Sequence, residues 1–158
     1  MVGILFGSRS DTERMTAAAR CLDEFEVPWE AHVLSAHRVP EELESRLADM
    51  EDKGVKVFIC GAGLAAHLPG VVASKTLRPV IGVPLAAKLN GLDALYSIVQ
   101  MPKPIPVAAV GVDNAYNAGM LAVEILAVGD ETLTRRLRQW RENMKRDFIA
   151  DNGEGVTL

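Results

Sequence analysis

The chain has 158 residues, with 49% hydrophobic residues, 24% charged residues and a formal net charge of −4 at neutral pH. This size and composition predict one globular domain and exclude disordered and disulfide-stapled classes. The negative charge argues against a nucleic-acid partner, and the longest apolar runs, such as 107–112, are too short to span a membrane.

Two further features concern location. Met1 leads into an apolar run without a basic leader, so no signal peptide is expected. Cys21 and Cys60 lack metal-ligand spacing and fall within a helical and a strand pattern. We therefore expect buried, reduced thiols, no metal site and a cytoplasmic protein.

Apolar runs alternate with helical patterns from the N-terminus to about residue 128. Strands are predicted at 2–6, 30–34, 56–60, 79–83 and 107–112. Between them, apolar residues recur at helical spacing, as at Leu43, Leu47 and Met50. The pattern predicts a three-layer α/β domain over 1–128, flavodoxin-like or Rossmann-like, with a parallel sheet between helices.

The first predicted strand is followed by a loop of small residues, Gly7-Ser8-Arg9-Ser10-Asp11. It leads into a helix, whose free N–H groups and dipole favour an anion such as phosphate. Ser8, Ser10 and Asp11 are candidate binding residues. The alternative is that Ser10 or Asp11 only caps the helix.

After the second strand comes Ser35-Ala36-His37-Arg38. His37 is an acid/base candidate and Arg38 is a fixed positive charge beside it. Ser35 and Ala36 would line the same place. On its own, such a histidine is more often a solvated or capping group.

After the third strand, the segment Gly61–Gly70 carries paired glycines, where backbone can approach a flat ring. We expect Gly61, Ala62, Gly63 and Leu64 to line the site. His67 is ranked below His37, since it could simply hydrogen-bond a carbonyl. Ligands bind at the carboxyl ends of parallel strands, so all three loops should form one site.

A different pattern follows over 130–148, where an apolar stripe lies among many charged residues. We assign 129–150 to an amphipathic C-terminal helix of the same domain, which packs on its own domain or on a neighbouring subunit. Residues 151–158 are expected to form a flexible tail. The stripe consists of Leu133, Leu137, Trp140, Met144 and Phe148.

Four segments, 7–11, 35–38, 61–70 and 95–102, resemble those of the phosphoribosylaminoimidazole carboxylase catalytic subunit. The likeness is greatest to the class I form, the N5-carboxyaminoimidazole ribonucleotide mutases, and covers 2 to about 128. It implies an isomerase of de novo purine biosynthesis. Such an enzyme moves a carboxylate from the exocyclic nitrogen to the imidazole ring carbon by decarboxylation and recapture of carbon dioxide, without metal or organic cofactor.

The resemblance also implies roles for individual residues. His37 corresponds to the catalytic proton shuttle, and the ribonucleotide would be held by Ser8, Asp11 and Arg38. The further substrate-binding positions are Ser10, Ser35, Ala36, Gly61, Ala62, Gly63, Leu64 and His67. The family is typically octameric through its C-terminal helices, and a separate carboxyaminoimidazole ribonucleotide synthetase would supply the substrate.

The chain departs from the family pattern at four positions. Leu64 stands where a glycine is usual, Val39 replaces a threonine, Ala94 a serine and Pro104 a glycine. None of these removes a catalytic group. Leu64 would have the largest effect, on substrate preference or rate.

Two alternatives remain open. A class II aminoimidazole ribonucleotide carboxylase would use carbon dioxide directly, but that pattern has lysine at position 38 and lacks the 65–70 run. The other is a non-catalytic flavodoxin-like module. A receiver would need an acidic residue at the end of its third strand, where Cys60 and Gly61 stand. A flavin carrier would need a threonine-rich phosphate loop and aromatic partners for the ring, whereas aromatic residues make up only 5% of this chain.

Overall fold

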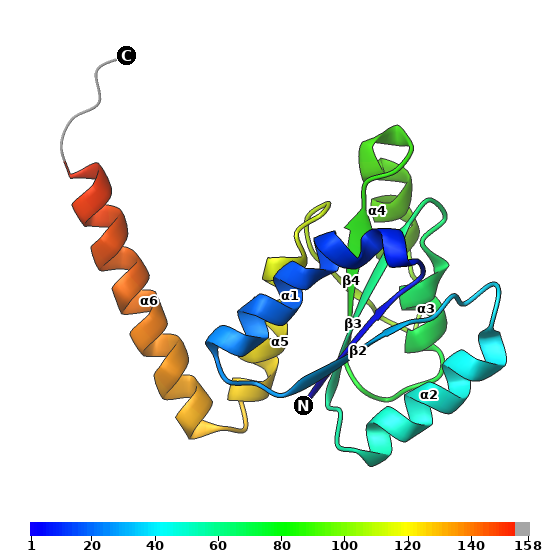
Figure 1. Ribbon diagram of the computed structural model, residues 1–158, viewed down its shortest axis with the longest axis horizontal. Helices are drawn as coiled ribbons and strands as arrows, with labels where there is room; N and C mark the ends of the chain where they lie inside the picture. The colour runs from blue at the N-terminus through cyan, green and yellow to red at the C-terminus, as the bar shows by residue number, and fades with distance from the viewer. Residues whose placement is uncertain (154–158) are drawn as a thin grey trace.

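The computed structural model describes residues 1–153 and contains a five-stranded parallel sheet in the order β2-β1-β3-β4-β5. This is the flavodoxin-like order, so the predicted fold class is confirmed. Figure 1 shows the strands running together through the centre of the molecule. The strands are β1 (Val2–Phe6), β2 (Trp29–Val33), β3 (Val57–Gly63), β4 (Val80–Leu85) and β5 (Ala108–Ala109).

Helices cover both faces of the sheet. On one face lie α1 (Thr12–Glu24) and α5 (Ala115–Ala127), and on the other α2 (Pro40–Asp52), α3 (His67–Ala73) and α4 (Leu92–Val99). Two 3₁₀ turns, η1 (Arg9–Asp11) and η2 (Leu89–Gly91), precede α1 and α4. The parallel connections require such crossovers, which bury the sheet on both sides.

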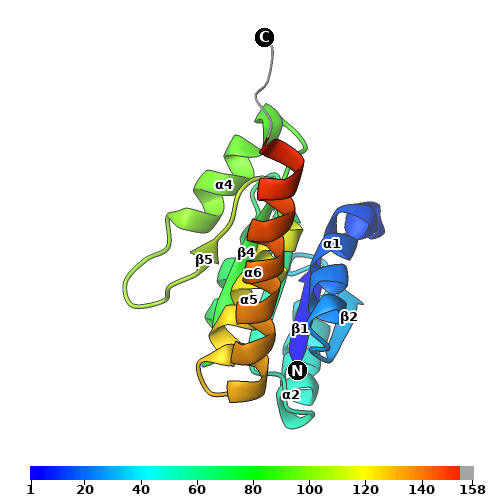
Figure 2. The same ribbon diagram turned by 90° about the vertical axis from the view of Figure 1, so that its left-hand side faces the viewer.

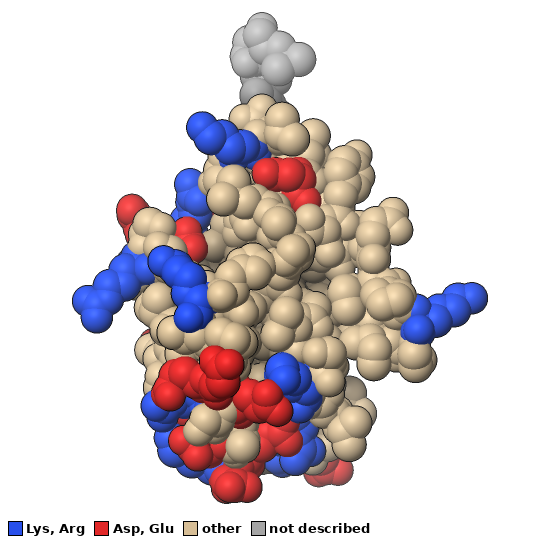
Figure 3. All heavy atoms as spheres, turned by 90° about the vertical axis from the view of Figure 1, so that its right-hand side faces the viewer, with Lys and Arg blue, Asp and Glu red and all other residues tan. Residues whose placement is uncertain are grey.

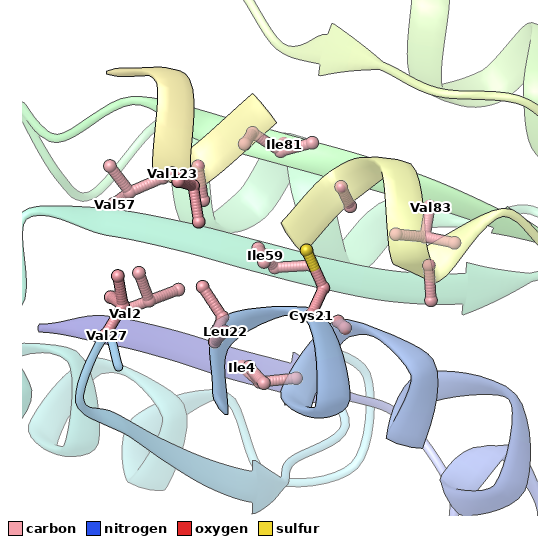
Figure 4. Packing of buried hydrophobic residues seen from close by; sticks show 14 of the residues in the cluster. Val2, Ile4, Cys21, Leu22, Val27, Val57, Ile59, Ile81, Val83 and Val123 are labelled. Carbon is pink, nitrogen blue, oxygen red and sulfur yellow. The ribbon is translucent and has the colours of Figure 1, made fainter. Parts of the chain in front are cut away.

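Alternate strand residues supply two separate cores. Ile4 and Ile59 belong to the cluster under α1 and α5, shown in Figure 4, whereas Leu5 and Phe58 belong to the cluster under α2, α3 and α4. The period-two alternation of a strand places neighbours on opposite faces. The central strands β1, β3 and β4 are therefore almost wholly buried, as their apolar pattern indicated, whereas the edge strand β2 carries Glu30 and His32 and has no buried residue.

The strand bounds differ from prediction mainly in the second half of the sheet. β3 runs to Gly63 rather than stopping at residue 60, because Gly61–Gly63 continue the ladder with Val83–Leu85 of β4. β5 is only two residues long, since only Ile81 and Gly82 of β4 pair with it. Apolar composition alone made 107–112 look like a full strand.

The C-terminal helix α6 (Glu131–Asn152) is capped by Asp130, whose carboxylate accepts hydrogen bonds from the N–H groups of Thr132 and Leu133 at 2.9 and 3.0 Å. Leu133 and Leu137 are its buried residues. Trp140 also packs on this core, with its ring centroid 5.8 Å from that of Phe25, and beyond it the helix diverges from α5 (Figure 1). Figure 2 shows α6 lying in front of α5.

α6 ends two residues later than the predicted 150. Of the predicted tail 151–158, residues 154–158 lie outside the described part of the chain. Within residues 1–153, no helix combines the length and the apolar character that crossing a bilayer requires.

Candidate active site

The loops after β1, β2 and β3 meet at the carboxyl edge of the sheet. β1 lies between β2 and β3, which is the topological switch point where open α/β sheets bind ligands. A cavity of about 400 Å³ opens there. Its lining brings together the predicted residues Ser8, Ser10, Asp11, Ser35, Ala36, His37, Arg38, Ala62, Gly63, Leu64 and His67.

Gly61 is the exception, and its predicted place in the lining is wrong. It lies within β3 rather than in the loop, and a Cβ built on it would collide with the Met15 side chain of α1. Its lack of a side chain therefore lets α1 pack on the sheet below the cavity. The extension of β3 explains the error.

The first loop is ordered by its own serines. Ser8 Oγ accepts hydrogen bonds from Ser10 N–H at 3.3 Å and from Ser10 Oγ at 2.9 Å, and so caps η1. Asp11 precedes α1 but makes no side-chain capping bond. The capping alternative therefore fails for Asp11, whose carboxylate lines the cavity instead.

Arg38 connects the second loop to the first. Its Nη2 donates to the Gly7 carbonyl at 2.8 Å, and its backbone N–H donates to Ser35 Oγ at 3.3 Å. A second depression of about 360 Å³ adjoins the cavity and shares Gly7, Ser8, Ser35 and Arg38 with it. Arg9 also lines this depression. Two guanidinium groups and two hydroxyls suit a phosphate.

His37 and His67 form a pair across the cavity. His37 Nε2 lies 2.7 Å from His67 Nδ1, and the rings meet edge to face with centroids 4.8 Å apart. At this distance one nitrogen must carry the proton and the other must accept it. Both side chains are exposed in the single chain. The sequence analysis ranked His67 well below His37 as a candidate catalyst. In the structure the two side chains form a hydrogen-bonded pair.

Sequence reasoning missed several lining residues. Arg9 was present in the first motif but was not selected, although its charge was the available signal. Ala87 lines the cavity from the segment after β4, a fourth strand that ends at the same edge. The other missed positions are Gly7, Ala65, Ala66 and Leu68.

The two cysteines lie outside this site and are fully buried. Burial, with the Glu24 carboxylate nearby, raises the pKa of Cys21 to about 12. Burial also raises the pKa of the Cys60 thiol far above its ordinary value. Neither is a nucleophile at neutral pH, as predicted.

Comparison with known proteins shows the family of the chain. The family model for AIR carboxylase matches residues 1–147. The N5-carboxyaminoimidazole ribonucleotide mutase of Pyrococcus abyssi is 54% identical over 146 residues, covering 92% of this chain and 84% of that protein. The mutase of Bacillus subtilis is 49% identical over 159 residues, covering 99% and 98%. The crystal structure of Treponema denticola PurE matches with a TM-score of 0.88 at 28% identity, over 96% of each chain. The chain therefore belongs to the AIR carboxylase family.

Proposed function

We propose that this chain is an N5-carboxyaminoimidazole ribonucleotide mutase, an isomerase of purine biosynthesis. The single observation that carries the proposal is the pairing of His37 with His67 at 2.7 Å beside a depression lined by two arginines. The mutases that are about half identical to the chain over most of its length support the same activity.

The phosphate end of the substrate occupies the depression beside the cavity. Arg9 and Arg38 supply fixed positive charge there, and Ser8 and Ser35 supply hydroxyl donors. Asp11 lies where the first loop passes into the cavity, and its carboxylate accepts hydrogen bonds from the ribose hydroxyls. This arrangement directs the imidazole ring toward the histidines.

The reaction at the ring balances without an outside reagent. The bond between the exocyclic nitrogen and the carboxylate carbon breaks, its electron pair stays on nitrogen, and carbon dioxide is released. The ring carbon then attacks carbon dioxide and afterwards loses its proton. One proton must reach the nitrogen and one must leave the ring carbon, so a single acid/base group serves both. We assign this transfer to His37.

His67 positions that group. A hydrogen bond to Nε2 fixes the tautomer and the ring orientation of His37, and hence which nitrogen faces the substrate. Arg38 remains charged throughout and therefore takes no part in proton transfer. In this proposal His37 moves the proton and His67 holds the His37 ring in place.

The test supplies purified protein with either N5-carboxyaminoimidazole ribonucleotide or the free aminoimidazole ribonucleotide plus bicarbonate. We expect rapid formation of the 4-carboxy product from the first substrate only. Conversion of the free ribonucleotide alone would establish the class II reaction instead, and no conversion of either would reject both. The related mutases leave the non-catalytic module without support.

We also propose the homo-octamer that the family resemblance implies. Leu92, Tyr96 and Val99 form an exposed apolar stripe on α4, and α6 exposes Met144 and Phe148. Figure 3 shows acidic side chains gathered over α2 and a largely uncharged surface over α3 and α4. Light scattering on the intact chain measures the assembly, and a monomer at micromolar concentration would contradict it.

The predicted supply of substrate by a separate synthetase and the cytoplasmic location belong to the same proposal. A carbamate that readily loses carbon dioxide is best delivered by an enzyme working in the same compartment. Combining this protein with such a synthetase should raise the yield of the 4-carboxy product above that of the two steps run one after the other.

A further inference from the structure

Leu64 occupies an unusual position at the mouth of the cavity. It follows β3 and precedes α3, in a turn closed by the hydrogen bond from Ala66 N–H to the Gly63 carbonyl at 3.0 Å. Its φ is +55°, in the left-handed region. Its side chain is 53% exposed, yet it lines the cavity.

The neighbours of Leu64 in this turn are all small. Gly63, Ala65 and Ala66 line the cavity beside it without a large side chain. Leu68 is the other leucine of the lining, but it is only 4% exposed and belongs to the core under α3. Leu64 is therefore the large apolar side chain of this turn that stands at the opening.

Folding stability does not explain a leucine at this position. A left-handed backbone is unfavourable for any residue with a Cβ atom, and glycine avoids that cost. Exposure also deprives the side chain of much of the gain from burial. What the leucine does provide is an apolar group in the lining of the cavity that also holds the His37–His67 pair.

The proposed reaction creates a need for such a group. After the nitrogen–carbon bond breaks, carbon dioxide is a small neutral molecule held by no charge or strong hydrogen bond. It must stay beside the ring carbon until the new carbon–carbon bond forms, and a water-filled opening lets it escape.

We propose that Leu64 covers the mouth of the cavity and retains carbon dioxide between its release and its recapture. The inference rests on the proposed mutase function. It assigns no chemical step to Leu64, whose side chain has no group that can exchange a proton. The effect is on where the carbon dioxide goes, not on how fast the first bond breaks.

The experiment uses the intact protein and substrate labelled with ¹³C in its carbamate carbon. Unlabelled bicarbonate and carbonic anhydrase are present, so escaped carbon dioxide is replaced by unlabelled carbon dioxide. Mass spectrometry then gives the fraction of product that has exchanged its carboxylate carbon. A sample without protein measures spontaneous loss of label.

Three variants are compared with the parent. Leu64→Ala removes the cover and keeps the Cβ atom, whereas Leu64→Gly also relieves the backbone conformation. Leu77→Ala is the matched control, because Leu77 is fully exposed and lies in the connection between α3 and β4, at the opposite edge of the sheet.

We expect the exchanged fraction to rise about threefold or more in both Leu64 variants and to stay at the parent value in Leu77→Ala. The glycine variant should also melt at a higher temperature than the alanine variant, since glycine tolerates φ of +55°. An exchanged fraction in Leu64→Ala equal to that of the parent overturns the inference, whatever its turnover. A parent that does not convert the substrate overturns the proposed function itself, which is a distinct result.

Discussion

Removing the His67 side chain tests the link between the two histidines. His67 Nδ1 lies 2.7 Å from His37 Nε2, so His67→Ala deletes one hydrogen bond to the proposed proton shuttle. Such a bond contributes about 0.5–1.5 kcal/mol. If it serves to orient His37, turnover should fall about two- to tenfold with little change in KM.

The control keeps the hydrogen bond and removes the imidazole ring. The side-chain amide of His67→Asn places a nitrogen or oxygen close to the position of Nδ1 but cannot take up a proton near neutral pH. We expect it to restore most of the turnover lost in His67→Ala. His37→Asn, by contrast, should lower turnover by about 10²–10⁴.

A double-mutant cycle in steady-state kinetics completes the test. If His67 acts through His37, adding His67→Ala to His37→Asn should cost little more. Two outcomes refute the reasoning. One is normal turnover in His67→Ala, and the other is His67→Asn being as slow as His67→Ala, which would make His67 a proton carrier.

Three further predictions concern binding, thiol reactivity and pH. Asp11→Ala should raise KM about tenfold and lower turnover less, because the carboxylate holds ribose; steady-state kinetics with the opposite split would give Asp11 a chemical role. Cys21 and Cys60 should not react with an aromatic disulfide reagent at about pH 8 until denaturant is added, since burial raises both pKa values. The pKa of Glu30 is raised by burial but lowered more by its bonds to Lys53 and His32, so it is lower in the folded than in the unfolded chain. Glu30→Gln should therefore cost about 0.2–1 kcal/mol in urea unfolding at neutral pH, a loss that disappears as pH falls through the folded pKa; an equal loss at acid pH would contradict this.

Much of the site was predictable because the parallel direction of the strands follows from simple rules. Short apolar segments alternating with helices require a parallel sheet, and parallel strands all end at one edge. The loops at 7–11, 35–38 and 61–70 were therefore expected to meet before any distance was known. The error at Gly61 came from the end of β3, since nothing in the residues 61–63 shows that they pair with β4.

The contact between the two histidines could not be predicted, because it depends on register across three strands. Phe6 of β1 pairs with Val33 of β2 on one side and with Gly61 of β3 on the other. β2 ends at Val33 and β3 continues to Gly63, so His37 follows the end of β2 by four residues and His67 follows the end of β3 by four. Sequence spacing gives those two offsets but not the turns that carry the side chains toward each other. Ala66, directly before His67, has a left-handed φ of +43° and forms part of such a turn. An alanine at this position gives no indication of that conformation.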